Sequence, residues 1–182
     1  NIMLRIFKYS LICILLFSFL TAGKRTVIKL ATLAPEGTDW HGMLVEFSQK
    51  IKKATDGNVT IRIYPSGVVG DERDMIRKMR IGQIHAAAIT TEGLSEINPD
   101  VNVFIIPMLF DSYDDVDWFR NKIGKRLEDG IKENGFTPLL WADVGWAHWF
   151  TVKPIRYPKD LKKAKIFTWA GDYNGAELWG KG

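Results

Sequence analysis

Strand-like and helix-like apolar patterns alternate along the early part of the chain. Residues 27–33 form an apolar, β-branched run that predicts a buried strand, ended by Pro35 and Gly37. Thr38 is the predicted N-cap of a helix, and the apolar face of this helix comprises Trp40, Leu44, Phe47 and Ile51. Residues 59–64 then alternate between apolar and polar, like a half-buried strand. The pattern therefore begins as strand, helix, strand.

The same alternation continues toward the C-terminus. We expect a helix capped by Asp71 and ended at Gly82, then a small-residue strand over 86–90 and a strand over 103–106. A long helix starts near Ser112, and its apolar face comprises Val116, Phe119, Ile123, Leu127 and Ile131. Further strands are predicted at 137–141, 149–152 and 165–168.

Strands that alternate with helices indicate an α/β fold with a mainly parallel sheet. In such sheets, ligands bind beyond the carboxyl ends of the strands. The segments that follow predicted strands here are 33–37, 90–93 and 107–110. These three segments are where we look first for a binding site.

The first 23 residues resemble a secretory signal peptide and are not expected to join the fold. Arg5 and Lys8 precede an apolar run over 11–20, and small residues follow at 21–23. The run is about half the ~20 residues that span a bilayer, which favours a cleaved signal over an uncleaved membrane anchor, the alternative reading. The chain closes on 178–182 within a helix-like pattern, so we expect it to be a fragment of a longer protein.

Charge and cysteine content narrow the function classes. The chain of 182 residues has a formal net charge of +4, from 25 basic and 21 acidic residues. Without the two basic residues of the signal segment, 23 basic residues face 21 acidic ones, and these alternate along the chain. A near-neutral balance gives no support for nucleic-acid binding. The single cysteine, Cys13, excludes a disulfide scaffold and a cysteine-ligated zinc site.

No catalytic or cofactor motif is present, so we expect no enzyme activity, cofactor or metal site. The turn at 67–70 is a weak phosphate-binding signal, and His41, His85 and His148 lack ligand-like spacing. The acids at 111–117 lie at the start of the long helix, where they cap amides and favour the positive end of the dipole.

Two features are candidates for ligand contact. Glu92 is expected in a loop at the carboxyl end of a strand, where it is either a ligand contact or an ordinary exposed acid. Aromatic residues are dense in the last third of the chain: Trp141, Trp146, Trp149, Phe150, Trp169 and Tyr173. Core packing accounts for most of them, but Trp146 follows Gly145 in a break between predicted strands and is the best candidate for a cleft wall.

The order of these segments resembles the solute-binding component of tripartite ATP-independent periplasmic (TRAP) transporters, the dicarboxylate-binding (DctP) type. The matching segments are 31–37, 55–59, 64–70, 82–86, 106–110 and 158–162. The resemblance implies a two-lobe α/β binding-protein fold, type II-like, which closes over one solute, with the C-terminal part of the fold missing from this chain. It also implies a first lobe over 24–140, crossing strands and an incomplete second lobe over 141–182, a periplasmic location, and a TRAP permease as partner.

One departure from the family concerns the ligand. The family often has an arginine in the strand after the Asp160–Leu161 segment, where its paired donors bind a ligand carboxylate. Phe167 stands in that place, and Ala147 and His148 stand where a second basic residue sometimes lies. The carboxylate clamp is therefore not carried over, and the solute is either less acidic, more aromatic, or bound through residues elsewhere.

The leading hypothesis is thus a small-solute receptor that serves a TRAP permease. The alternatives are a secreted α/β enzyme with catalytic residues outside this chain and a binding protein that feeds a signalling receptor. The residues expected to face the cleft are Glu36, Trp40, Thr91, Glu92, Trp146, Phe167 and Trp169.

Overall fold

The structure, a computed structural model, describes residues 25–146, 148, 150–162 and 164–165. It divides into two compact units, one up to Glu96 and one from Ile97. This division does not test the lobe boundary predicted near residue 140, which stays a prediction. Within the described residues, no helix combines the length and the apolar character needed to cross a membrane.

The first unit is built on a small parallel sheet. Strands β1 (Thr26–Thr32), β2 (Val59–Tyr64) and β3 (Ala86–Ala88) lie in the order β2-β1-β3, and both neighbours run parallel to β1. Thr26 pairs with Val59, and Leu30 pairs with Ala86. This alternation of parallel strands with helices confirms the predicted α/β class.

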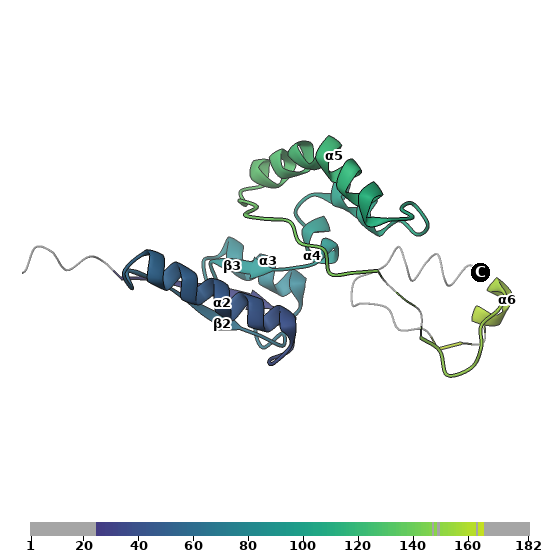
Figure 1. Cartoon of the computed structure of the whole chain (residues 1–182), viewed down its shortest axis with the longest axis horizontal. Helices are drawn as coiled ribbons and strands as arrows, with labels where there is room; N and C mark the ends of the chain where they lie inside the picture. Colours follow the sequence, from purple (N-terminus) through teal and green to yellow (C-terminus); the bar gives the residue numbers. More distant parts are fainter. Residues whose placement is uncertain (1–24, 147, 149, 163, 166–182) are drawn as a thin grey trace, which may run out of the picture. The chain divides into compact units, whose positions relative to one another are not determined.

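Two helices connect the strands of this sheet. Helix α2 (Asp39–Ala54) runs alongside β2, and helix α3 (Glu72–Arg80) contacts β3 (Figure 1). The predicted caps are confirmed, because the Thr38 and Asp71 side chains accept hydrogen bonds from the first turns of α2 and α3. The predicted apolar face of α2 is only half-buried, and Phe47 is 36% exposed.

A tight core lies between α3 and one face of the sheet. Ala31 and Met75 are fully buried, and they pack with Ile84. Half-buried apolar side chains surround these three residues: Leu33, Val69, Met79, Ala87 and Ile89. The small side chains of β1 and β3 let α3 approach the sheet closely, as the small-residue strand predicted.

The segment after β3 differs from the sequence-based expectation. Residues 91–95 form a short helix, α4 (Thr91–Ser95), so Glu92 lies in a helical first turn and not in a loop. The predicted strand over 103–106 is also wrong, because Pro99–Ile105 form the 3-10 helix η2. Asn98 caps η2 through Asp100 N, and Pro99 occupies its first turn, where a missing N–H costs nothing. An apolar run this short does not distinguish a strand from a helix.

Helix α5 (Tyr113–Glu133) dominates the second unit and begins next to Ser112, as predicted. Its N-cap is the Ser112 hydroxyl, which accepts a hydrogen bond from Asp115 N. Leu127 and Ile131 are buried on its inner face, and η2 contacts the same helix. The predicted strand over 137–141 is wrong, because these residues pair with no strand among those described. The same holds for 150–152, whereas Trp149 and residues 166–168 lie outside the described residues. The short helix α6 (Pro158–Leu161) follows.

Candidate functional site

The candidate site of the first unit lies at the carboxyl edge of its sheet. On one side of β1, the chain after β1 is tied to the chain after β2: Ser66 N donates to Ala34 O at 3.0 Å, and Gly67 N donates to Thr32 O at 3.1 Å. Glu36 N adds a hydrogen bond to the Ser66 hydroxyl at 3.2 Å. The other side, between β1 and β3, is where the strand order reverses, and ligands bind at such switch points in α/β sheets.

Four of the predicted site residues lie at this edge. Glu36 is exposed in the loop after β1, and Trp40 is half-buried at the start of α2. Thr91 and Glu92 are half-buried in the first turn of α4, which follows β3. The topology therefore brings residues that are fifty positions apart in the sequence to one edge. Their contact with a ligand stays a prediction.

The remaining predicted site residues belong to the second part of the chain. Trp146 is 42% exposed, and its ring lies 5.3 Å from the ring of Tyr113, centroid to centroid. Gly145, just before it, has a φ of 113°, a backbone conformation that favours glycine. Phe167 and Trp169 lie outside the described residues. For these three aromatic residues, the role in a cleft stays a prediction.

Sequence reasoning missed Glu72, an acid at the sheet edge whose carboxylate accepts three hydrogen bonds. Its side chain is buried, with 5% exposed, in the first turn of α3. Its carboxylate accepts hydrogen bonds from Thr90 N at 2.9 Å, the Thr90 hydroxyl at 2.8 Å and Gly93 N at 2.8 Å. In the sequence, Glu72 looks like an ordinary first-turn acid beside the cap Asp71, and only the glycine inside α4 hints at a close approach.

The aromatic residues of the second unit illustrate the packing role expected for most of them. Phe104 contacts Phe110, Phe119 and Trp141, with ring centroids 6.0–6.1 Å apart. The indole N–H of Trp141 donates to Glu128 Oε1 at 3.0 Å. Because these rings are held by one another and by α5, Trp141 is a structural residue of this unit.

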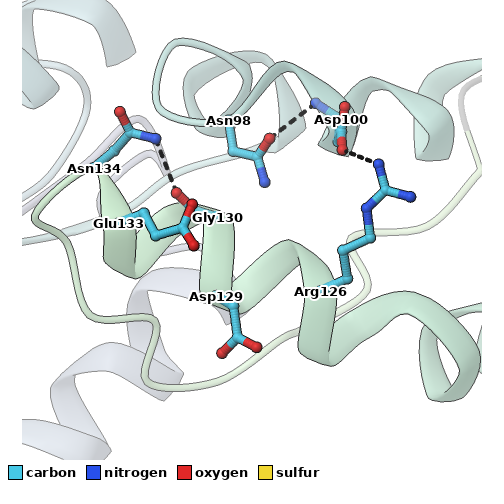
Figure 2. Close-up of a pocket in the computed structure, with 7 residues that line it drawn as sticks. All are labelled: Asn98, Asp100, Arg126, Asp129, Gly130, Glu133 and Asn134. Carbon is cyan, nitrogen blue, oxygen red and sulfur yellow. Dashed lines mark hydrogen bonds and ion pairs between the residues drawn. The ribbon is translucent and has the colours of Figure 1, made fainter.

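An open pocket of about 420 Å³ lies in the second unit, and none of the predicted site residues lines it (Figure 2). Two of its side chains have partners in the lining: Arg126 pairs with Asp100 at 2.8 Å, and Asn134 donates to the backbone carbonyl of Gly130 at 2.9 Å. Asn98 donates to Leu127 O at 3.2 Å and so ties η2 to α5. We interpret the pocket as a by-product of this docking contact.

Two histidines of the first unit, His85 just before β3 and His41 in α2, have backbone partners. His85 Nδ1 accepts a hydrogen bond from Lys29 N at 3.0 Å, and His41 Nδ1 accepts one from Gly37 N at 3.3 Å. In both rings the hydrogen bond occupies Nδ1. Among the residues that the structure describes, no three His, Cys, Asp or Glu side chains gather in a way that could hold a metal ion.

Comparison with known proteins identifies the family. Residues 30–176 match the family model described as "Bacterial extracellular solute-binding protein, family 7", also called DctP. The chain belongs to this family. A solute-binding protein of Roseobacter denitrificans is 27% identical over 146 residues, which cover 79% of this chain and 45% of that relative.

Solved DctP-family structures agree with the match. A TRAP periplasmic solute-binding protein of Citrobacter koseri, with bound D-glucuronate, is 31% identical with a TM-score of 0.66, over 75% of this chain and 46% of that one. A homologue from Anaerococcus prevotii, with bound D-glucuronate, has a TM-score of 0.75 over 86% of this chain and 52% of that one. At 24% identity, the second likeness concerns the fold. The chain thus spans about half the length of these relatives.

These comparisons confirm the resemblance to TRAP solute-binding proteins and the α/β fold of that family. Members of this family are described as extracellular solute-binding proteins. The family-typical segments at 31–37 and 64–70 are the ones that meet at the carboxyl edge of the sheet.

Proposed function

We propose that this DctP-family protein is an extracytoplasmic receptor that binds a small organic solute between two lobes and delivers it to a TRAP-type permease. The observation that carries this proposal is the family match over residues 30–176. The location follows from the same match, together with the signal-like segment at the N-terminus. We further propose that the receptor releases its ligand chemically unchanged.

The sheet edge of the first unit supports this function. It combines an aromatic wall residue, Trp40, with carboxylate and hydroxyl groups on Glu36, Thr91 and Glu92. Small-solute sites are typically apolar walls with few polar groups that fix the orientation of the ligand. Trp146 is proposed separately as an aromatic contact of the ligand.

The ligand class is proposed from the ligands of the homologues and from one position at which this sequence departs from the family pattern. The two solved homologues hold D-glucuronate, a sugar acid with several hydroxyl groups and one carboxylate. Hydroxyl groups suit the acceptors at the sheet edge, because each can donate a hydrogen bond to a carboxylate or threonine oxygen. Phe167 in place of the family's arginine argues against a site built on a dicarboxylate clamp. We therefore propose a hydroxylated organic acid as the first class to test.

The test is ligand binding by the protein in its full coding length. We expect native mass spectrometry to detect a small co-purified organic molecule, and thermal unfolding to shift upward with D-glucuronate or a related sugar acid. A ligand at 100 times its Kd stabilises the folded state by about 2.7 kcal/mol. Absence of any shift across sugar acids, dicarboxylates and aromatic acids would contradict the proposal. Conversion of the ligand into a product would favour a secreted enzyme instead.

Delivery to a permease needs its own experiment. We expect solute uptake by cells to require both this protein and a TRAP permease encoded beside its gene. Uptake that persists after deletion of that permease, with loss of a sensory response on deletion of this protein, would favour the signalling alternative.

A further inference from the structure

The buried carboxylate of Glu72 joins two elements that lie far apart in the sequence. Oε1 accepts from Thr90 N at 2.9 Å, while Oε2 accepts from both the Thr90 hydroxyl and Gly93 N at 2.8 Å. Two of the donors belong to Thr90, the N-cap of α4, and the third is the Gly93 amide in the first turn of α4. Hydrogen bonds to an ionised acceptor are about twice as strong as those between neutral groups, so this contact is a strong one.

The approach of α4 to Glu72 is too close for any residue except glycine at position 93. A Cβ atom added to Gly93 would lie 2.7 Å from Glu72 Oε2, 2.8 Å from Glu72 Cβ and 3.2 Å from Ile89 Cβ. Real Cβ atoms essentially never come within 3.0 Å of such neighbours. The Glu72 side chain can therefore lie against α4 only because residue 93 has no side chain of its own.

Helix α4 is too short to be stable by itself, so its position depends on its neighbours. It contains five residues, and isolated helices shorter than ~12 residues are marginal in water. Its first turn is closed by Thr90, whose hydroxyl accepts from Glu92 N at 3.2 Å. At its other end, Glu96 pairs with Arg73 at 2.7 Å. Neighbouring residues of α3 thus hold both ends of α4.

We propose that Glu72 is a positioning residue for ligand binding: its buried carboxylate fixes the Thr90–Gly93 backbone and so sets where Thr91 and Glu92 lie at the sheet edge. The part that concerns the ligand rests on the proposed function. The part that concerns α4 does not, and the two parts are tested separately.

The first experiment measures amide hydrogen exchange, residue by residue, in the full-length protein without ligand. Glu72→Gln replaces one acceptor oxygen by an NH₂ group that faces donors, so we expect exchange at Thr90 and Gly93 to accelerate at least tenfold. Exchange at Glu92 should accelerate too, because its partner Thr90 is released. The matched control is Glu46→Gln, which changes an exposed helical glutamate paired with Lys50. Unchanged exchange at residues 90–93 in Glu72→Gln would overturn the proposal.

The second experiment measures D-glucuronate binding by calorimetry. We expect Glu72→Gln to weaken binding at least tenfold and Glu46→Gln to leave it unchanged. If Glu72 acts through Glu92, the double variant Glu72→Gln/Glu92→Gln should bind no more weakly than Glu92→Gln alone. Faster exchange at α4 combined with wild-type affinity in Glu72→Gln would overturn the positioning role. So would a double variant whose loss of affinity equals the sum of the losses in the two single variants.

Two further outcomes remain decisive. If Glu72→Gln fails to fold, Thr90→Val removes the hydroxyl from the same contact and leaves Glu72 in place. We expect it to accelerate exchange at Glu92 and Gly93 and to weaken binding, and wild-type behaviour would overturn the proposal. If the wild-type protein binds no sugar acid, that part of the proposed function fails, and hydrogen exchange alone decides whether Glu72 positions α4.

Discussion

Replacing Gly93 by alanine should destabilise the first unit, although alanine is the better helix former. The added methyl group would lie 2.7–2.8 Å from the Glu72 side chain and 3.2 Å from Ile89. Overpacking of this kind costs about 1–3 kcal/mol, and displacing Gly93 N from a carboxylate costs about 1.5–3 kcal/mol more. The higher helix propensity of alanine offsets about 1 kcal/mol of this loss. We therefore expect a loss of about 1.5–5 kcal/mol in the free energy of unfolding.

Gly124 offers a matched control for the same substitution. It lies inside α5, and an added Cβ would meet only Arg120 Cγ, at an ordinary contact distance of 3.6 Å. Gly124→Ala should therefore stabilise its unit by about 0.5–1 kcal/mol, the usual gain for this change inside a helix. The same chemical change is thus expected to act with opposite sign at two helical sites.

The assay is urea unfolding followed by circular dichroism, with hydrogen exchange to assign each transition to a unit. Exchange at Ala31, a buried residue of β1, reports on the first unit, and exchange at Leu127 reports on the second. The reasoning is refuted if Gly93→Ala is neutral or stabilising. It is also refuted if Gly124→Ala is as destabilising as Gly93→Ala, because available space would then not be the deciding factor.

Three other predictions concern the ligand, a helix cap and a titrating pair. Trp146→Ala should weaken ligand binding tenfold or more, and unchanged affinity by calorimetry would remove it from the site. Ser112→Ala removes the N-cap that binds Asp115 N at 3.1 Å and should cost about 0.5–2 kcal/mol in urea unfolding, whereas Ser112→Asp should cost little. The hydrogen bond and charge of Lys50 lower the Glu46 pKa, so this pair stabilises the fold above the ordinary glutamate pKa and less as pH falls through the lowered value. Lys50→Gln should raise the Glu46 pKa in an NMR titration, and no change would contradict the pairing.

The parts of the fold that the sequence predicted well are those set by neighbouring residues. Thr38 and Asp71 cap their helices as expected, because a side-chain oxygen beside the first turn acts over three residues. The run at 103–106 was misassigned because Asn98 and Pro99, upstream of it, direct the backbone into a 3-10 turn. Local pattern thus succeeds where the partner is close in the sequence.

The features that the sequence did not predict depend on contacts between residues far apart in the chain. The segment 137–141 has strand-like composition, but a strand needs a partner, and none of the described strands pairs with it. Glu72 is buried by the turn at 90–93, about twenty residues away, which no periodicity in α3 reveals. The alternation of strands and helices predicted that residues 33–37 and 90–93 follow strands of a mainly parallel sheet, and the structure has them there, whereas ligand binding at this edge stays a prediction. The alternation did not predict which acid stabilises that edge.

The Glu72 contact also bears on the charge of the ligand. Helix N-termini attract anions through free amides and a positive dipole end. At α4, an internal carboxylate already takes up the Thr90 and Gly93 amides, and the Thr90 hydroxyl takes up that of Glu92. A carboxylate brought in by a ligand would find these donors in use and a like charge beside them. The first unit therefore already carries its own anion at the N-terminus of α4.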